Sequence, residues 1–331
     1  MALPRSRSYL GIAKETRPTP GSTPTAVAAT DFIPYTSISP FDNIAYLDDK
    51  GMRGSMVDEY DVIQGPIYSE FDFGGDVFAD TIGYVVGGVL GDVATTGSSA
   101  PYTHVISTLN SQATNGQPVT WTLSDYYAGG TASTRQYAGV QFASVDLKFS
   151  ADALLTYAAK GMGFKSATAS NPTPSFSTVT ALPSWTGTVT LNGSSTAIMA
   201  DGNCNISRPV SPIFTVKGTQ DPYQLFAGPV TAGGSMTLVF ETDAELNYYL
   251  NNTKPSLDID FVQGSGAGAQ EVKIHMTKCA FTIAKIERSK DYIELSVTYK
   301  AMANTTDAGV SAGYSPIKVT LKNAKPSGTY A

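Results

Sequence analysis

The sequence contains little cysteine, little charge and no long apolar run. Among its 331 residues only 15% are charged, and the two cysteines are Cys204 and Cys279. Two thiols are too few for a disulfide framework or a metal cluster, and we favour two small buried side chains over a single disulfide bridge. No apolar stretch reaches the roughly 18–20 residues of a membrane span. The first residues lack the apolar core of a secretory signal, so we expect no membrane segment and no export by that route.

The chain is also poor in the residues and motifs of catalysis. Only two histidines are present, His104 and His275, and we expect both on the exposed faces of strands. The sequence has no nucleophile elbow G-x-S-x-G, no H-E-x-x-H and no paired C-x-x-C. Asp72, Asp76 and Asp80 recur every four residues, but we interpret them as a strand end, a helix cap and an exposed helix residue rather than Ca²⁺ ligands. We therefore predict no enzyme, and no cofactor or metal.

What the sequence does have is alternation. Apolar residues at every second position, with polar residues between them, recur in five segments: 67–73, 119–124, 257–261, 272–276 and 317–322. A period of two with one polar face is typical of antiparallel sheet. The abundance of Thr, Ser, Gly and Tyr fits exposed strands and turns. The predicted fold class is mainly β.

Two segments have helical periodicity instead. Residues 76–91 carry one apolar stripe, with Asp76 as the expected N-cap. Three glycines inside this helix cost roughly 0.5–1 kcal/mol each, so the helix requires close packing against a neighbour. The second helix, 242–250, opens with a capping box formed by Thr242 and Glu245. We expect its buried face to consist of Leu246, Tyr249 and Leu250.

One pattern occurs twice. Residues 150–158 read "SADALLTYA" and residues 289–297 read "SKDYIELSV", each a Ser-x-Asp turn before an extended apolar segment. Phenylalanines precede both, Phe142 and Phe281, at the same offset of 139 residues. Each predicted helix also follows a strand that ends in phenylalanine, and aligning those ends gives an offset of 167. The order strand, helix, strands and hairpin therefore indicates two related β domains, each with one flanking α-helix.

The duplication predicts a division of the chain into five parts. Residues 1–49 are an N-terminal arm and lead-in segment, of which 1–30 should order only against a neighbour or stay mobile, because their Pro, Thr and Ser cannot bury enough apolar surface. The remaining predicted parts are a first β domain at 50–166 with a loop-rich insertion at 94–136, a linker at 167–199, a second β domain at 200–305, and a C-terminal strand and tail at 306–331.

Charge is distributed unevenly along the chain. The formal net charge is −6, which argues against a protein that grips duplex nucleic acid. Between residues 40 and 92 eleven carboxylates face only Lys50 and Arg53, so this stretch carries −9 and the rest of the chain +3. Such an acidic surface repels nucleic acid or meets a basic neighbour.

The order of several motifs resembles the major tail tube proteins of long-tailed (siphovirus-type) bacteriophages. Near the start, Gly11, Lys14, Glu15 and Thr16 form the pattern G-x-x-K-E-T, followed by "GSTP" at 21–24 and "FIP" at 32–34. In mid-chain, "RQYAGVQFASVDLKFSADALLTYAAKGMG" is similar to the family's strand, turn and strand. The likeness covers about residues 9–305. A doubled domain departs from tube proteins that have one domain.

The resemblance implies a fold and a mechanism. Each tube domain is a β-sandwich or barrel with one flanking helix, and sheets of neighbouring subunits join edge to edge into a ring around a channel. Two tandem tube domains in one chain give either a trimer with pseudo-six-fold symmetry, which we favour slightly, or a hexamer in which only one domain lines the channel. Exposed sheet edges, a hazard for a monomer, are then the binding surfaces.

Candidate site residues follow from the same resemblance. A lumen that lets DNA slide should not attract phosphate, so we expect acidic side chains to face it, and we name five candidates: Asp58, Glu59, Asp61, Glu70 and Asp72. If the first three line the channel, lysines in their place should slow genome ejection. Contacts between stacked rings are expected at the conserved-looking start of the arm, from Tyr9, Lys14, Glu15 and Thr16, and at the insertion 94–136.

The resemblance also implies partners and a location. Rings of identical subunits stack into a tube in the virion tail, assembled in the host cytoplasm, and meet a tape-measure protein, a tail terminator and distal tail proteins. Double-stranded DNA passes through without specific binding, and no membrane is involved. Two structural alternatives are a capsid decoration protein and a surface adhesin of two β-sandwiches. A carbohydrate-active enzyme would need clustered exposed tryptophans, and only Trp121 and Trp185 are present.

Overall fold

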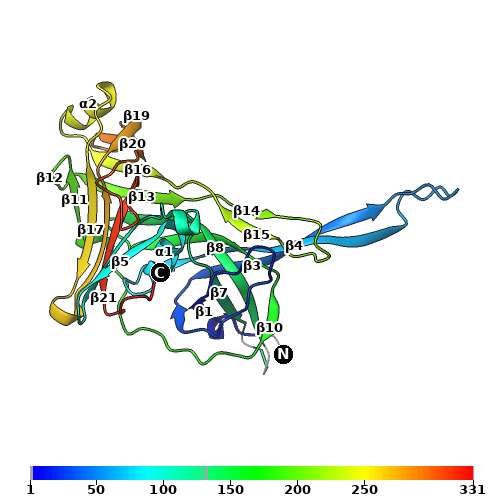
Figure 1. The fold of residues 1–331 in the computed structure, drawn as a ribbon. Coiled ribbons are helices and arrows are strands. Elements are labelled where there is room, and N and C mark those ends of the chain that lie inside the picture. Colours follow the sequence, from blue (N-terminus) through cyan, green and yellow to red (C-terminus); the bar gives the residue numbers. More distant parts are fainter. Residues whose placement is uncertain (1–2, 128, 131–132, 331) are drawn as a thin grey trace.

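The protein is built from two packed antiparallel sheets and a long projecting hairpin (Figure 1). A computed structural model describes residues 3–127, 129–130 and 133–330, and these residues contain two α-helices among many strands. The prediction of a mainly β chain is confirmed. Side chains of the two sheets meet in one core, where the rings of Phe149 and Phe261 lie 5.7 Å apart.

The larger sheet contains a row of eight strands, here called the long row, in the order β3-β4-β9-β8-β13-β16-β20-β19. The bounds of these strands are Ser37–Asp49 (β3), Asp61–Asp76 (β4), Thr156–Gly163 (β9), Thr134–Ser150 (β8), Met199–Ser207 (β13), Thr231–Val239 (β16), Glu294–Ala301 (β20) and Cys279–Glu287 (β19). The N-terminal half of β8 leaves the row and carries four shorter strands: β7 (Trp121–Tyr126), β1 (Tyr9–Lys14), β2 (Asp31–Ile33) and β10 (Ala167–Ala169).

The second sheet covers the core from the other side in the order β12-β11-β17-β18-β21-β6-β5. Its strands are Ser194–Thr196 (β12), Gly187–Leu191 (β11), Leu257–Gln263 (β17), Gln270–Met276 (β18), Lys318–Asn323 (β21), Tyr102–Thr108 (β6) and Gly91–Thr96 (β5). A separate hairpin joins Val210–Ile213 (β14) to Gln224–Ala227 (β15). Strands from both halves of the sequence therefore share both sheets, and the predicted domain boundaries stay a prediction.

Most of the predicted alternation is found in the strands. In β4, Ile67, Phe71 and Phe73 are buried on one face, and β17, β18 and β21 likewise bury every second residue. The segment 119–124 differs, because both faces of β7 are buried. Its polar face is covered by the start of the chain, where Thr122 donates to Glu15 and accepts a hydrogen bond from the Val27 N–H at 3.0 Å.

The N-terminal segment is more ordered than its composition suggests. Residues 9–14 form β1, which pairs with β7 on one side and β2 on the other, and Leu10 and Ile12 are almost completely buried. The prediction that residues 1–30 lack structure of their own is therefore wrong for β1. The predicted loop-rich insertion 94–136 likewise contains β6 and β7. Composition missed these strands because their stability comes from long-range pairing.

Helix α1 (Ile82–Leu90) lies in the core and is tightly covered. Asp76 ends β4, and Thr81 occupies the N-cap, so the predicted cap was placed too early. The expectation that its glycines need a close neighbour is confirmed. A Cβ at Gly83 would lie 2.6 Å from the ring of Tyr330, and one at Gly88 would lie 2.3 Å from Phe142.

Helix α2 (Ala244–Leu250) is shorter and more exposed than predicted. None of its residues is fully buried, and Leu250 is 64% exposed. Only Leu246 and Tyr248 pack against the core, so the predicted face of Leu246, Tyr249 and Leu250 is one-third right. Thr242 Oγ1 accepts a bond from the Ala244 N–H at 3.3 Å, which caps the helix without help from Glu245.

The C-terminal segment closes the core like a plug. The side chain of Tyr330 is 1% exposed, and its hydroxyl donates to the Asp80 carbonyl at 2.7 Å and contacts the Asn323 amide at 3.1 Å. Its ring packs edge-on against Tyr84 and His104. His104 is thus fully buried, because the C-terminal strand covers a face that the sequence predicted to be exposed.

We expect Tyr330→Ala to lower the free energy of unfolding by about 3–5 kcal/mol, since it leaves a large cavity beside α1. Tyr330→Phe keeps the ring and loses only the hydroxyl, so its cost should be about 1 kcal/mol. Denaturant unfolding of both variants measures the two costs. Equal costs would show that the ring does not fill the core.

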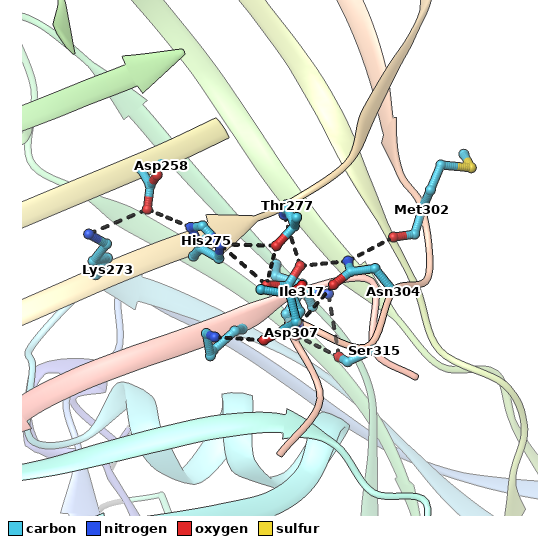
Figure 2. A network of polar contacts seen from close by, with 11 residues as sticks. Asp258, Lys273, His275, Thr277, Met302, Asn304, Asp307, Ser315 and Ile317 are labelled. Carbon is cyan, nitrogen blue, oxygen red and sulfur yellow. Dashed lines mark hydrogen bonds and ion pairs between the residues drawn. The ribbon is translucent and has the colours of Figure 1, made fainter. Parts of the chain in front are cut away.

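A polar network fixes the segment that follows β20 (Figure 2). Asp307 is fully buried, and its carboxylate accepts hydrogen bonds from the Thr277 N–H, the Thr277 hydroxyl and the Asn304 amide at 2.7–2.8 Å. His275 bridges this cluster to Asp258, with Nδ1 2.7 Å from the Asp258 carboxylate. The network connects the loop before β21 to β17 and β18, and so positions the strand that joins the two halves of the second sheet.

A buried carboxyl group in β7 makes stability depend on pH. Burial raises the pKa of Asp125 to about 6. The folded state then holds a proton that the unfolded chain releases near its ordinary pKa. Stability should therefore fall by about 3 kcal/mol as pH rises from about 4 to 6, and stay level above that. Thermal unfolding from pH 4 to 7 should show this decline in the natural chain and a flatter profile in Asp125→Asn. Parallel profiles would contradict the assignment.

Candidate assembly surface

The long row consists of one four-strand unit written twice. In β3-β4-β9-β8 the strands follow the chain order first, second, fourth, third, and β13-β16-β20-β19 repeats that order. In each unit the second strand leads into a helix, α1 or α2, and the last two strands form a hairpin. The repeat read from the sequence therefore corresponds to two copies of one topology side by side in a single sheet.

A shared irregularity fixes the residue equivalence of the two units. The register between β8 and β9 shifts between Phe142 and Ser144, and the register between β19 and β20 shifts between Phe281 and Ile283. Both shifts lie 139 residues apart, as the sequence repeat predicted. A bulge at the same position in both hairpins is a feature that related units share.

The strand pairings extend this equivalence across each unit. Opposite Ser144 and Ile283 lie Lys160 and Thr298, and opposite these lie Asp72 and Ser235. The offset of the strands before the helices is thus 163, and the sequence-based value of 167 was wrong by about one helical turn. One strand further out, the partner of Asp72 is Ser39 and the partner of Ser235 is Asn203.

The two units are joined by continuous antiparallel pairing of β8 with β13. Seven residue pairs run from Ser144–Ser207 to Ser150–Asp201. Among the described residues, β3 pairs only with β4 and β19 only with β20, so both ends of the long row are free edges. Because β3 is equivalent to β13 and β19 to β8, the two free edges are the counterparts of the two strands that already meet inside the subunit.

One face of the long row is open and polar. Starting from Asp72, alternation along the paired strands places small hydroxyl, amide and glycine residues on it, together with seven carboxylates and four lysines. The carboxylates are Glu70, Asp72, Asp76, Asp146, Asp201, Glu287 and Glu294, and the lysines are Lys148, Lys160, Lys285 and Lys300. The face therefore carries a formal charge of −3.

Three of the four lysines on this face lie beside a carboxylate. Lys160 Nζ is 3.3 Å from Asp72, Lys148 Nζ is 3.6 Å from Asp146, and Lys285 Nζ is 2.7 Å from Glu287. Such exposed pairs add little stability. They do neutralise the cations locally, which leaves few charges free to attract a polyanion.

The β3–β4 hairpin carries a second exposed surface. Its base is braced by the β14–β15 hairpin, where the Ile67 N–H donates to the Gln220 carbonyl at 3.0 Å. Beyond this point the hairpin projects alone (Figure 1). Its outer part, residues 46–63 and here called the hairpin tip, exposes seven large apolar side chains by half or more: Tyr46, Leu47, Met52, Met56, Val57, Val62 and Ile63. An isolated two-stranded hairpin with such a surface is marginal in water.

The five predicted acidic residues fall into two places. Asp58, Glu59 and Asp61 lie on the hairpin tip, where Glu59 pairs with Lys50 at 2.9 Å. Glu70 and Asp72 lie on the open face of β4. The sequence run brings these groups close along the chain, but the extended strand separates them in space.

The predicted ring-contact residues surround the start of the chain. Glu15 is buried, and its carboxylate accepts hydrogen bonds from Thr122 and from the Gly139 N–H at 2.9 Å. Burial raises the pKa of Glu15 despite these bonds. Tyr9 is half-buried, stacked on Tyr126, while Lys14 and Thr16 are exposed. Glu15 thus stabilises its own subunit, and contacts of the other three with a second ring stay a prediction.

The described residues show little that suggests chemistry or membrane insertion. They contain no cluster of three or more His, Cys, Asp or Glu side chains arranged to hold a metal ion. Cys204 and Cys279 are both buried free thiols, as expected, and burial raises the pKa of Cys204 to about 12. None of the helices in the described part of the chain has the length and apolar character to cross a bilayer.

Sequence reasoning missed the free edges themselves. The signal that could have found them was the 139-residue repeat, because a duplicated sheet unit implies one joint inside the chain and one unused edge at each end. Comparison with known families gives one match: a model described as phage tail tube protein covers residues 5–301. No curated protein sequence matches the chain.

Proposed function

Because the chain belongs to the phage tail tube protein family, we propose that it is the major tail tube subunit of a long-tailed phage. In this role it forms rings that stack into the hollow tail through which DNA reaches the host. The observation that carries the proposal is the doubled four-strand unit with a free edge at each end. A monomer gains nothing from such edges, whereas a ring removes them by closure.

The doubled unit favours three subunits in a ring. Two equivalent units lie side by side within one chain and are already joined as neighbours in a ring would be. Three chains then supply six units, which gives pseudo-six-fold symmetry and a continuous wall. A hexamer of this chain would need twice as many units, or would leave half of them out of the wall.

The open face of the long row is the surface that we assign to the channel. It is polar, it carries a net charge of −3, and most of its lysines are paired with carboxylates. DNA affinity depends on cations that replace the counterions of phosphate. A face of this composition offers few such cations, so duplex DNA would pass along it without being held.

The hairpin tip is the part that we assign to contacts between rings. It reaches beyond the sheets, and its apolar side chains have no partners within the described residues of the subunit. Stacking on the next ring would cover them. The tape-measure protein, tail terminator and distal tail proteins would then meet the inside and the two ends of the stack, in the virion tail assembled in the host cytoplasm.

Electron microscopy of the purified protein tests the proposal. We expect rings, or tubes with a central channel, either spontaneously or after seeding with tail tips. A uniform monomer at high concentration that no seed converts would contradict a tube subunit and would return attention to an adhesin or a capsid decoration protein.

A further inference from the structure

We propose that β19 of one subunit pairs with β3 of a second copy in the antiparallel register that β8 and β13 use within one subunit. The inference rests on the proposed ring and adds which strands meet and which residues oppose each other. The two edges are equivalent to the two strands of the internal joint, and the internal joint is therefore a template for the external one.

The register follows from the residue equivalences. In the internal joint Lys148 lies opposite Asn203. The counterpart of Lys148, 139 residues later, is Glu287, and the counterpart of Asn203 is Ser39. Glu287 should then lie opposite Ser39 of the second copy. By the same steps Lys285 opposes Phe41, and Ile283 opposes Asn43.

Side chains at the two edges support this register. Phe41 is 58% exposed and Ile283 is 55% exposed, both on the open face that is otherwise polar. In the proposed joint they are diagonal neighbours across the two strands, within reach of an aromatic ring. Their counterparts in the internal joint are Asn205 and Ser144, which are small or polar. Large apolar residues thus replace polar ones where two separate molecules must hold together.

The core side of the joint is compatible with burial. Ala284 would oppose Asp42, whose carboxylate already accepts hydrogen bonds from the Ser69 hydroxyl at 2.5 Å and the Ser166 N–H at 3.0 Å. The charge of Asp42 is therefore satisfied before a neighbour arrives. Ile286 would oppose Pro40, which brings one apolar side chain against another.

The hydrogen-bonding pattern also transfers. The Arg208 N–H donates to the Ala143 carbonyl across the internal joint at 2.7 Å. Hydrogen-bonded pairs alternate in antiparallel sheet, so the next ones are Val145–Ile206 and Leu147–Cys204. Their counterparts are Ala284–Asp42 and Ile286–Pro40. Pro40 has no N–H, so this rung holds one hydrogen bond instead of two.

Cysteine pairs test the register. Ser39 and Glu287 would form a pair without backbone hydrogen bonds, in which Cα atoms lie about 4.5 Å apart, within the range of a disulfide. A chain carrying Ser39→Cys and Glu287→Cys should, after mild oxidation of assembled rings, run as covalent dimers and trimers. The matched control carries Ser39→Cys and Ile283→Cys, four residues out of register and roughly 13 Å along the strand. The native thiols are buried and should add little background.

The outcomes separate the joint from the function. Crosslinking of the first pair and not of the control supports the register. Rings in which the control crosslinks as well as the first pair, or better, would overturn the register while leaving the ring in place. Rings with no crosslink in either variant would show that other surfaces meet. No rings from either variant or from the natural chain would instead contradict the proposed function.

Discussion

A subunit in which residues 47–63 are replaced by an Asn-Gly turn should form rings but no tubes. Tyr46 lies opposite Gln64, so a two-residue turn can close the shortened hairpin there. The removed residues make their ion pairs with one another, as Lys50 does with Asp48 and Glu59, and the sheets should fold without them. What is lost is the exposed apolar surface that we assign to the next ring.

Negative-stain microscopy and sedimentation measure this effect. We expect a change from long tubes to single rings, with thermal stability of the subunit close to that of the natural chain. The matched control shortens the β17–β18 turn, residues 264–269, which exposes no large apolar side chain and should leave tubes intact. Tubes of normal length from the shortened β3–β4 hairpin would refute its role in stacking.

Ala284→Pro should abolish ring formation while the subunit remains folded. Ala284 lies in the edge strand β19, and the transferred ladder pattern directs its N–H away from β20 toward the neighbour. Proline removes that donor and adds bulk at the edge, which is the device that natural sheets use to block pairing. The same change acts at all three joints of a ring, so we expect assembly to be lost rather than merely weakened.

A second edge provides the control for this variant. Ser195 lies in β12, the edge of the other sheet, and the two-residue turn Asn192–Gly193 places its N–H away from β11 as well. Ser195→Pro should assemble normally. Size-exclusion chromatography with light scattering compares the two, and circular dichroism confirms that both are folded. If Ala284→Pro still forms rings, β19 is not an edge of the joint.

Local patterns predicted the elements of this fold better than their arrangement. Alternation located β4, β17, β18 and β21, because each buries one face and exposes the other. The repeated Ser-x-Asp turns gave the offset of 139 correctly, since both hairpins keep the same length and bulge. The offset before the helices failed, because Phe73 and Phe240 look alike but occupy different places in the pairing.

The rest depends on contacts between distant parts of the chain. Nothing near Leu10 indicates a strand, and β1 exists because β7 and β2 flank it. His104 alternates with apolar residues, yet the C-terminal Tyr330 covers it. The candidate site was predicted in kind, as exposed sheet edges, but the residues named for it were those of the acidic run and the arm. Which edges remain free could be seen only once β8 was found beside β13.

The number of chains in a ring tests the central claim most directly. Cryo-electron microscopy of end-on rings gives the rotational symmetry, and native mass spectrometry of single rings gives the count of 34.8 kDa chains. We predict three chains in each ring, with true three-fold and approximate six-fold symmetry, and both four-strand units lining the channel. Six chains with only one unit of each in the wall would contradict the account.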